Sequence, residues 1–108
     1  MTTKGKFYVR NESKYPITGS VTYHEKGESR IEFIDLLPKS KTDEKGFTSG
    51  AATKDTWYYD YSQNSKAHIG SKDCAFYAKD QVGPVEIIIG DDYLKVVPAK
   101  SGSCVKEF

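Results

Sequence analysis

The feature that most constrains the fold is a series of short runs rich in β-branched and aromatic residues, separated by turn-forming residues. The chain has fourteen Val and Ile, eight Thr, eight Tyr and five Phe, but only three Leu and six Ala. β-branched and aromatic side chains fit a pleated sheet and lose rotamer freedom in a helix. No window longer than about seven residues keeps the spacing of an amphipathic helix. We therefore expect an all-β protein with no helix beyond a short turn.

The predicted strands pair through short connections. Residues 85–89 and 93–97 flank Gly90-Asp91-Asp92 and form the clearest predicted hairpin. Residues 17–25 and 29–37 are joined by a short segment that contains Gly27, which predicts a second antiparallel hairpin. The other predicted strands are residues 6–11, 47–53, 56–62, 74–79 and 104–108, with at most a short strand at 67–69.

The fold class follows from the number and spacing of these strands. A chain of 108 residues forms one domain, which we place at residues 1–108. Seven to nine short strands without an internal repeat are typical of an antiparallel two-sheet β-sandwich. A small flattened β-barrel is the alternative architecture.

One predicted strand carries a break in its alternation. In residues 29–37, Ile31 and Phe33 share one face, and the apolar set then moves to the other face at Ile34 and Leu36. A slip of one residue in a period-2 pattern predicts a β-bulge, unless both faces of the strand are buried there.

The stretch from Asp55 to Gln63 concentrates four aromatic rings in nine residues. Alternation puts Trp57, Tyr59 and Tyr61 on one face of a strand, and Tyr58 and Asp60 on the other. An aspartate is rarely buried without a partner, so the face with Asp60 is expected to meet water. We therefore predict that the first three rings are core and that Tyr58 is exposed.

Charge and hydropathy exclude several classes of partner. The net charge is +1, without a long run of either sign, which argues against a nucleic-acid partner. No stretch has the roughly 20 apolar residues of a membrane-spanning helix, and no signal peptide is visible. This pattern favours a cytoplasmic or leaderless protein over a secreted one.

The sequence offers little for catalysis or metal binding. The common nucleotide, hydrolase and metalloprotease motifs are absent, so we expect a protein that is not an enzyme and has no catalytic residues. Neither histidine is in a motif, and a zinc site is not expected because the spacing of the histidines and cysteines matches no ligand pattern. We expect no cofactor, although acidic turn residues leave calcium open, at Asp91 and Asp92 or at Asp73 and Asp80.

Cys74 and Cys104 are the two cysteines, and they permit one disulfide. We expect the bridge if the protein is secreted and two reduced, buried thiols if it is cytosolic. The tripeptide Asn11-Glu12-Ser13 matches an N-glycosylation sequon, which would be used only in a secreted protein.

The function that the sequence favours is a binding module. Tyrosine supplies flat contact area with a polar tip at low entropic cost, as binding surfaces require. We therefore expect lectin-like recognition of a carbohydrate or glycoconjugate, through rings that stack on sugars and polar groups that bind their hydroxyls. The candidate ligand-binding residues are Tyr58, Asp60, Asn64, Tyr77, Asp92 and Tyr93.

Two other kinds of binding stay open. The same tyrosines, with the lysines of residues 39–45, would suit a membrane-surface contact like that of small β-sandwich cytolysins. A protein-protein interaction or inhibitor domain is the other alternative, with Ile88 as an exposed residue beside Glu86 on the strand at 85–89. Oligomeric state and ligand identity are left open.

Overall fold

The computed structural model describes residues 3–24, 29–49 and 55–108 of the chain. Nine strands lie in these ranges, and the helix between β6 and β7 is a short 3₁₀ helix, η1. The bounds are β1 (Thr3–Asn11), β2 (Ile17–Tyr23), β3 (Ser29–Leu36), β4 (Lys45–Ser49), β5 (Thr56–Gln63), β6 (Lys66–Asp73), η1 (Ala78–Val82), β7 (Val85–Ile89), β8 (Tyr93–Val97) and β9 (Cys104–Glu107).

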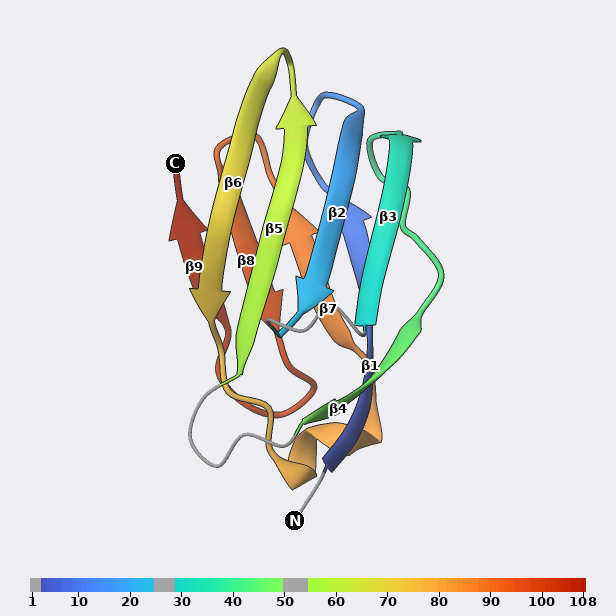
Figure 1. Cartoon of the computed structure of the whole chain (residues 1–108), viewed down its shortest axis with the longest axis vertical. Coiled ribbons are helices and arrows are strands. Elements are labelled where there is room, and N and C mark those ends of the chain that lie inside the picture. Colours follow the sequence, from blue (N-terminus) through green and yellow to red (C-terminus); the bar gives the residue numbers. More distant parts are fainter. Residues whose placement is uncertain (1–2, 25–28, 50–54) are drawn as a thin grey trace.

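The strands form two sheets that pack face to face, as Figure 1 shows. Sheet A has the order β4-β1-β7-β8-β9, and sheet B has the order β3-β2-β5-β6. Every pair of neighbours is antiparallel except β1 and β7, which are parallel. The predicted all-β sandwich is therefore confirmed, with one parallel pair.

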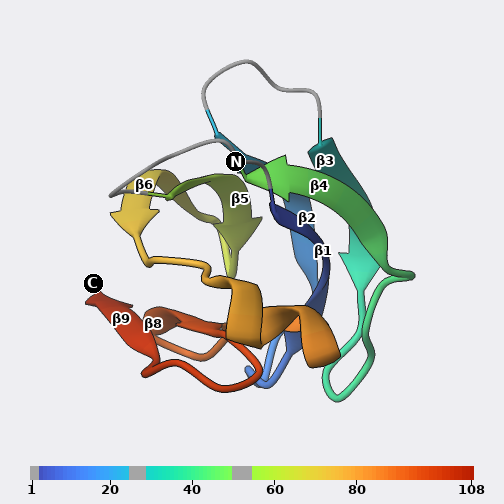
Figure 2. The same cartoon turned by 90° about the horizontal axis from the view of Figure 1, so that it is seen from below.

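The edges of the two sheets approach one another on both sides of the sandwich, as seen from below in Figure 2. β3 lies near β4 on one side, and β6 lies near β9 on the other. Within the described ranges no strand pairing joins the sheets, so the molecule is a sandwich rather than the flattened barrel considered as the alternative.

The core lies between the sheets and is built from the inward positions of both. Strand alternation directs every second residue of β1, β5, β7 and β8 into it. Trp57 contacts Phe7, Tyr23 and Phe47 edge-on, with ring centroids 4.9 to 5.3 Å apart. The largest fully buried side chains are Trp57, Tyr61, Phe7, Ile17, Ile87, Ile89 and Leu94.

Most local predictions are confirmed. The predicted hairpins are β2–β3 and β7–β8, and the bulge lies in β3. Ile17 pairs with Leu36 but Gly19 pairs with Phe33, so β3 has one more residue than β2 between these pairs. Asp35, inside the bulge, has a φ of 47°.

Two local predictions are wrong. Of the strand expected at residues 74–79, residues 74–77 are irregular chain and residues 78–79 begin η1. Instead of a strand ladder, the Trp57 side chain donates to the Cys74 carbonyl oxygen, and the Asp55 carboxylate accepts from the Phe76 backbone. The expected short strand at 67–69 is the eight-residue β6. Asn64 and Ser65, with φ of 49° and 65°, form the tight turn that pairs β6 with β5 along its whole length.

Two strands end differently from the prediction. β2 stops at Tyr23, since His24 has a φ of 64°. β4 spans Lys45–Ser49, and the rest of the strand expected at 47–53 lies outside the described residues.

Candidate functional site

The outer face of sheet B carries the exposed side of the aromatic stretch. Trp57, Tyr59 and Tyr61 are 1%, 4% and 2% exposed and belong to the core, as predicted from the alternation. Tyr58 is 36% exposed, and Asp60 points to solvent on the same face. β5 is an inner strand of this sheet, so both side chains lie away from its edges.

Three of the four side chains directly opposite these two are short Ser or Thr side chains. Tyr58 lies opposite Thr22 on β2 and Ser71 on β6, and Asp60 lies opposite Ser20 and Ile69. Because these neighbours do not fill the surface, a shallow depression of about 350 Å³ opens between the longer side chains. It is lined by Ser20, Thr22, Arg30, Tyr58, Tyr59, Asp60, Ile69, Gly70 and Ser71.

A smaller depression of about 240 Å³ adjoins the first one on the β3 side. The two share Ser20, Arg30 and Asp60, and the second continues to Glu32 and Ile34. Gly19 is required there, because a Cβ at its position would lie 2.1 Å from the backbone oxygen of Asp60. Asp60 lines both depressions.

The polar groups of this surface have free hydrogen-bonding capacity. Among the residues that the structure describes, the Asp60 carboxylate and the hydroxyls of Tyr58, Thr22 and Ser71 have no hydrogen-bond partner. Within the described part of the chain, Arg30 has one ion-pair contact, 3.4 Å from its Nε to the Glu32 carboxylate, and both side chains are more than half exposed. An exposed pair of this kind contributes little stability, so the guanidinium also stays available.

The structure does not gather all six predicted residues at this place. Asn64 lies in the tight turn between β5 and β6, where its left-handed backbone suits the residue type. Tyr77 precedes η1 at the opposite end of the sandwich and is 55% exposed. Asp92 and Tyr93 lie at the start of β8 in sheet A, beside a depression of about 380 Å³. Tyr58 and Asp60 are the only two of the six that line one depression on sheet B.

Sequence reasoning missed the residues that other strands contribute to the depression. Arg30, Thr22 and Ser71 come from β3, β2 and β6, and their place depends on strand register. The predicted β2–β3 hairpin could have put Thr22 opposite Arg30. No local signal in the sequence puts β6 beside β5 over its full length.

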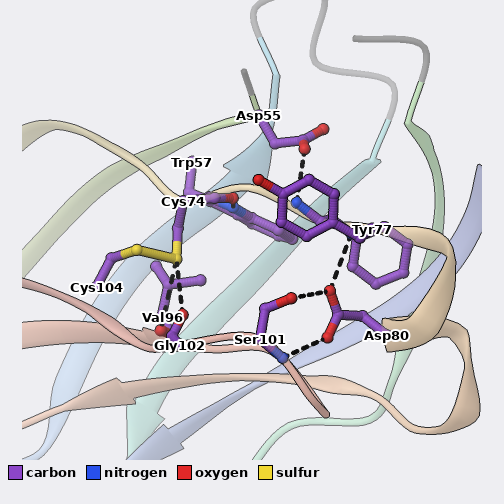
Figure 3. The surroundings of a disulfide bond; sticks show 10 residues. Asp55, Trp57, Cys74, Tyr77, Asp80, Val96, Ser101, Gly102 and Cys104 are labelled. Atoms are coloured by element: carbon purple, nitrogen blue, oxygen red, sulfur yellow. Dashed lines mark hydrogen bonds between the residues drawn. A yellow bond between two sulfur atoms is a disulfide. The ribbon is translucent and has the colours of Figure 1, made fainter. Parts of the chain in front are cut away.

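The aspartates near the disulfide contrast with Asp60. Asp80 is fully buried and accepts four hydrogen bonds, from the backbone of Tyr77, Lys100 and Ser101 and from the Ser101 hydroxyl, as drawn in part in Figure 3. Burial raises the pKa of this carboxyl, but the four donors outweigh it and hold the pKa below its ordinary value. Asp80 therefore ties η1 to the loop before β9.

Asp55 is the second buried aspartate. It accepts hydrogen bonds from the Tyr23 hydroxyl, from Ser49 Oγ at 2.6 Å and from the Phe76 backbone at 2.7 Å. Burial and the bond to Asp55 raise the pKa of Tyr23 to about 12. These contacts hold the segment after β6 against the core.

The two cysteines form a disulfide, Cys74–Cys104, which links this same segment to β9. The bridge leaves no thiolate for the zinc ligand set considered from the sequence. In the described part of the chain no group of three or more His, Cys, Asp or Glu side chains could hold a metal ion. Of the carboxylates considered for calcium, Asp80 is fully used by protein donors.

The sequon at Asn11 has a structural role. Asn11 is 0% exposed, and its amide nitrogen donates to the carbonyl oxygens of Tyr15 and Leu36 at 2.7 and 2.8 Å. Its side-chain oxygen accepts from the backbone and hydroxyl of Ser13. In the folded protein this amide is therefore not accessible for glycosylation.

Comparison of the chain with known proteins identifies no related family. No protein-family model matches the chain, and no curated protein matches it significantly. Among the described residues there is no helix long and apolar enough to cross a membrane.

Proposed function

We propose that this protein is a non-catalytic carbohydrate-binding module whose site is the outer face of sheet B around Tyr58 and Asp60. The observation that carries the proposal is the set of polar side chains without partners in one shallow depression, next to a partly exposed tyrosine ring. A sugar offers an apolar C–H face and several hydroxyls at fixed spacing. Such a ligand matches an aromatic ring surrounded by free donors and acceptors.

Each residue has a distinct part in this proposal. The Tyr58 ring supplies the surface on which a sugar ring stacks. The Asp60 carboxylate accepts hydrogen bonds from two hydroxyls, and the Arg30 guanidinium donates to ring or hydroxyl oxygens. The Thr22 and Ser71 hydroxyls add contacts on either side of β5.

The test is a glycan-array screen of the purified protein, followed by calorimetric titration of the glycans that bind. We expect Tyr58→Ala and Asp60→Asn each to weaken binding by roughly tenfold or more, without lowering the melting temperature. Tyr77→Ala and Asp43→Asn are matched controls, because they change an exposed residue of the same type outside the depression. Equal loss of affinity in the controls, or absence of glycan binding, would refute the proposal.

A membrane-surface contact is a second candidate, and η1 favours it. Tyr77 and Val82, at the two ends of this segment, are 55% and 72% exposed. Lys79 Nζ lies 5.8 Å from the centroid of the Tyr77 ring. Aromatic, apolar and basic side chains together suit the headgroup level of a bilayer. Sedimentation with anionic and neutral vesicles tests it, and loss of vesicle binding in Tyr77→Ala with glycan binding unchanged would support it.

A further inference from the structure

The depression around Tyr58 does not end at the edge of sheet B. A neighbouring depression of about 350 Å³ shares Tyr59, Ile69, Gly70 and Ser71 with it and extends along β6 to His68 and Phe108. Phe108 also lines the depression at Asp92 and Tyr93 on sheet A. The three depressions therefore follow one another from β3 across sheet B, around the edge where β6 approaches β9, and onto the outer face of β8 in sheet A. We call this series of depressions the track.

The middle of this track is an aromatic platform. The Phe108 ring stacks on His68, with centroids 4.1 Å apart and planes at 29°, and contacts Tyr59 edge-on at 5.6 Å. Its backbone nitrogen donates to the Asp92 carbonyl oxygen at 3.0 Å. These contacts hold Phe108 in place, and the residue is 45% exposed, so it still offers surface to a ligand.

Gly70 keeps the passage between the two depressions open. A Cβ at this position would lie 2.6 Å from the Tyr59 hydroxyl, so any side chain there would displace the tyrosine. The absence of a side chain at Gly70 leaves room for the Tyr59 hydroxyl, and both residues line the two depressions. The glycine thus makes the track continuous.

The far end of the track, like the first depression, combines a tyrosine with an aspartate and a basic side chain. Tyr93 is half-buried, and Asp92, Lys95 and Glu107 lie around it. Lys106 joins this group from the β6 side. Among the described residues no ion pair occupies these charged side chains. An aromatic ring with free polar groups is again present.

We infer that the ligand is an extended, linear oligosaccharide or polysaccharide that follows this track, with Tyr58 and Phe108 as two separate stacking platforms. The inference depends on the proposed carbohydrate binding and specifies its ligand class. Strands lie about 4.8 Å apart, so the path across sheet B alone is about 14 Å, before it crosses to sheet A. This is longer than a monosaccharide, and a terminal sugar would leave most of the track empty.

The experiment is a calorimetric titration with linear β-1,4-glucose, β-1,3-glucose, N-acetylglucosamine, xylose and mannose oligosaccharides of increasing chain length. We expect affinity for one series to rise roughly tenfold or more between the shortest ligand that binds and the longest. Phe108→Leu removes the aromatic ring but keeps apolar volume on His68, and it should abolish this gain, so that the longest ligand binds no more tightly than the shortest one. Tyr58→Ala should weaken binding at every length.

The possible failures are distinct from one another. Affinity that does not depend on chain length, or a gain with length that Phe108→Leu preserves, overturns the extended track but leaves a sugar site at Tyr58. Absence of binding in every linear series, with binding on the glycan array, overturns the extended ligand but leaves a sugar site at Tyr58. Absence of binding on the array as well overturns both proposals. Val82→Ala changes an exposed apolar residue in η1, outside the track, and serves as the control that should leave binding unchanged. Melting temperatures of all variants verify that the fold is intact.

Discussion

The outer faces of the two sheets use the same residue types in opposite ways. On sheet A, Tyr8 lies directly opposite Glu86, and its hydroxyl donates to that carboxylate. Arg10 donates to the same carboxylate at 2.9 Å, and Lys41 Nζ lies 4.8 Å from the centroid of the Tyr8 ring. Burial and the bond to Glu86 raise the pKa of Tyr8. The hydrogen-bonding groups of Tyr8 and Glu86 are therefore paired with each other.

On sheet B the tyrosine and the carboxylate do not meet. Tyr58 and Asp60 lie two residues apart on one strand, and short Ser and Thr side chains stand next to them on β2. Tyr8 is 9% exposed, whereas Tyr58 is 36% exposed. The comparison indicates that cross-strand neighbours decide whether a polar side chain stabilises the fold or is free to bind a ligand.

The largest expected effect comes from removing a carboxylate whose oxygens are all used. Asp80→Ala would leave four buried or half-buried donors without their acceptor. We expect the free energy of unfolding to fall by on the order of 3 kcal/mol, measured by urea denaturation at neutral pH. A loss as small as that of Asp60→Ala would contradict the distinction between used and free aspartates.

Acid should act on the same group. The pKa of Asp80 is lower in the folded than in the unfolded state, so the unfolded chain binds more protons between the two values. Its stabilising contribution is present above the unfolded pKa of about 3.9 and is lost as the pH falls through the folded pKa. Urea denaturation between neutral pH and about pH 2 should show a smaller decrease in Asp80→Asn than in the unmodified protein. Equal pH dependence in the two proteins would show that ionisation of Asp80 does not contribute to the pH dependence of the free energy of unfolding.

Two buried tyrosine hydroxyls should respond in opposite directions to the same change. The Tyr23 hydroxyl donates to Asp55, whereas the Tyr61 hydroxyl is buried without a hydrogen-bond partner among the described residues. We expect Tyr23→Phe to lower the free energy of unfolding by about 1 to 2 kcal/mol, and Tyr61→Phe to raise it by about 1 kcal/mol. Denaturation measured side by side tests this pair, and destabilisation by both variants would refute it.

The smallest effects belong to the outer faces themselves. Glu86→Gln weakens the contacts with Tyr8 and Arg10 on a half-exposed surface, and we expect a loss of about 1 kcal/mol or less. Asp60→Asn should change the free energy of unfolding by less than about 0.5 kcal/mol. If Asp60→Asn lowers the free energy of unfolding more than Glu86→Gln does, then Asp60 stabilises the fold, and the contrast between the two outer faces is wrong.

The parts of the fold that could be predicted are those with a local pattern. The alternation in residues 56–62 identified the buried and exposed faces of β5, because strand side chains alternate strictly. The slip at Ile34 predicted the bulge, and Gly90-Asp91-Asp92 predicted the β7–β8 hairpin. Residues 74–79 have a strand composition, but residues 74–77 are irregular and 78–79 begin η1, because the Trp57 and Asp55 side chains bind the backbone of Cys74 and Phe76.

The candidate site could be predicted only in part for the same reason. Tyr58 and Asp60 share a face by alternation within one strand. Arg30 and Ser71 join them through the registers of β2–β3 and β5–β6. The continuation to Phe108 depends on the packing of one sheet edge against the other, which no local pattern encodes.

By itself the sequence determined the fold class and, where the alternation is clear as in β5, the inner and outer faces of a strand, because a period-2 pattern needs only neighbouring residues. The tertiary structure decided which polar groups have partners. Tyr8 meets Glu86 through the parallel pairing of β1 and β7, and Asp80 meets Ser101 through a loop that the disulfide holds nearby. These contacts join distant segments, and their geometry depends on the register and packing of the whole sandwich.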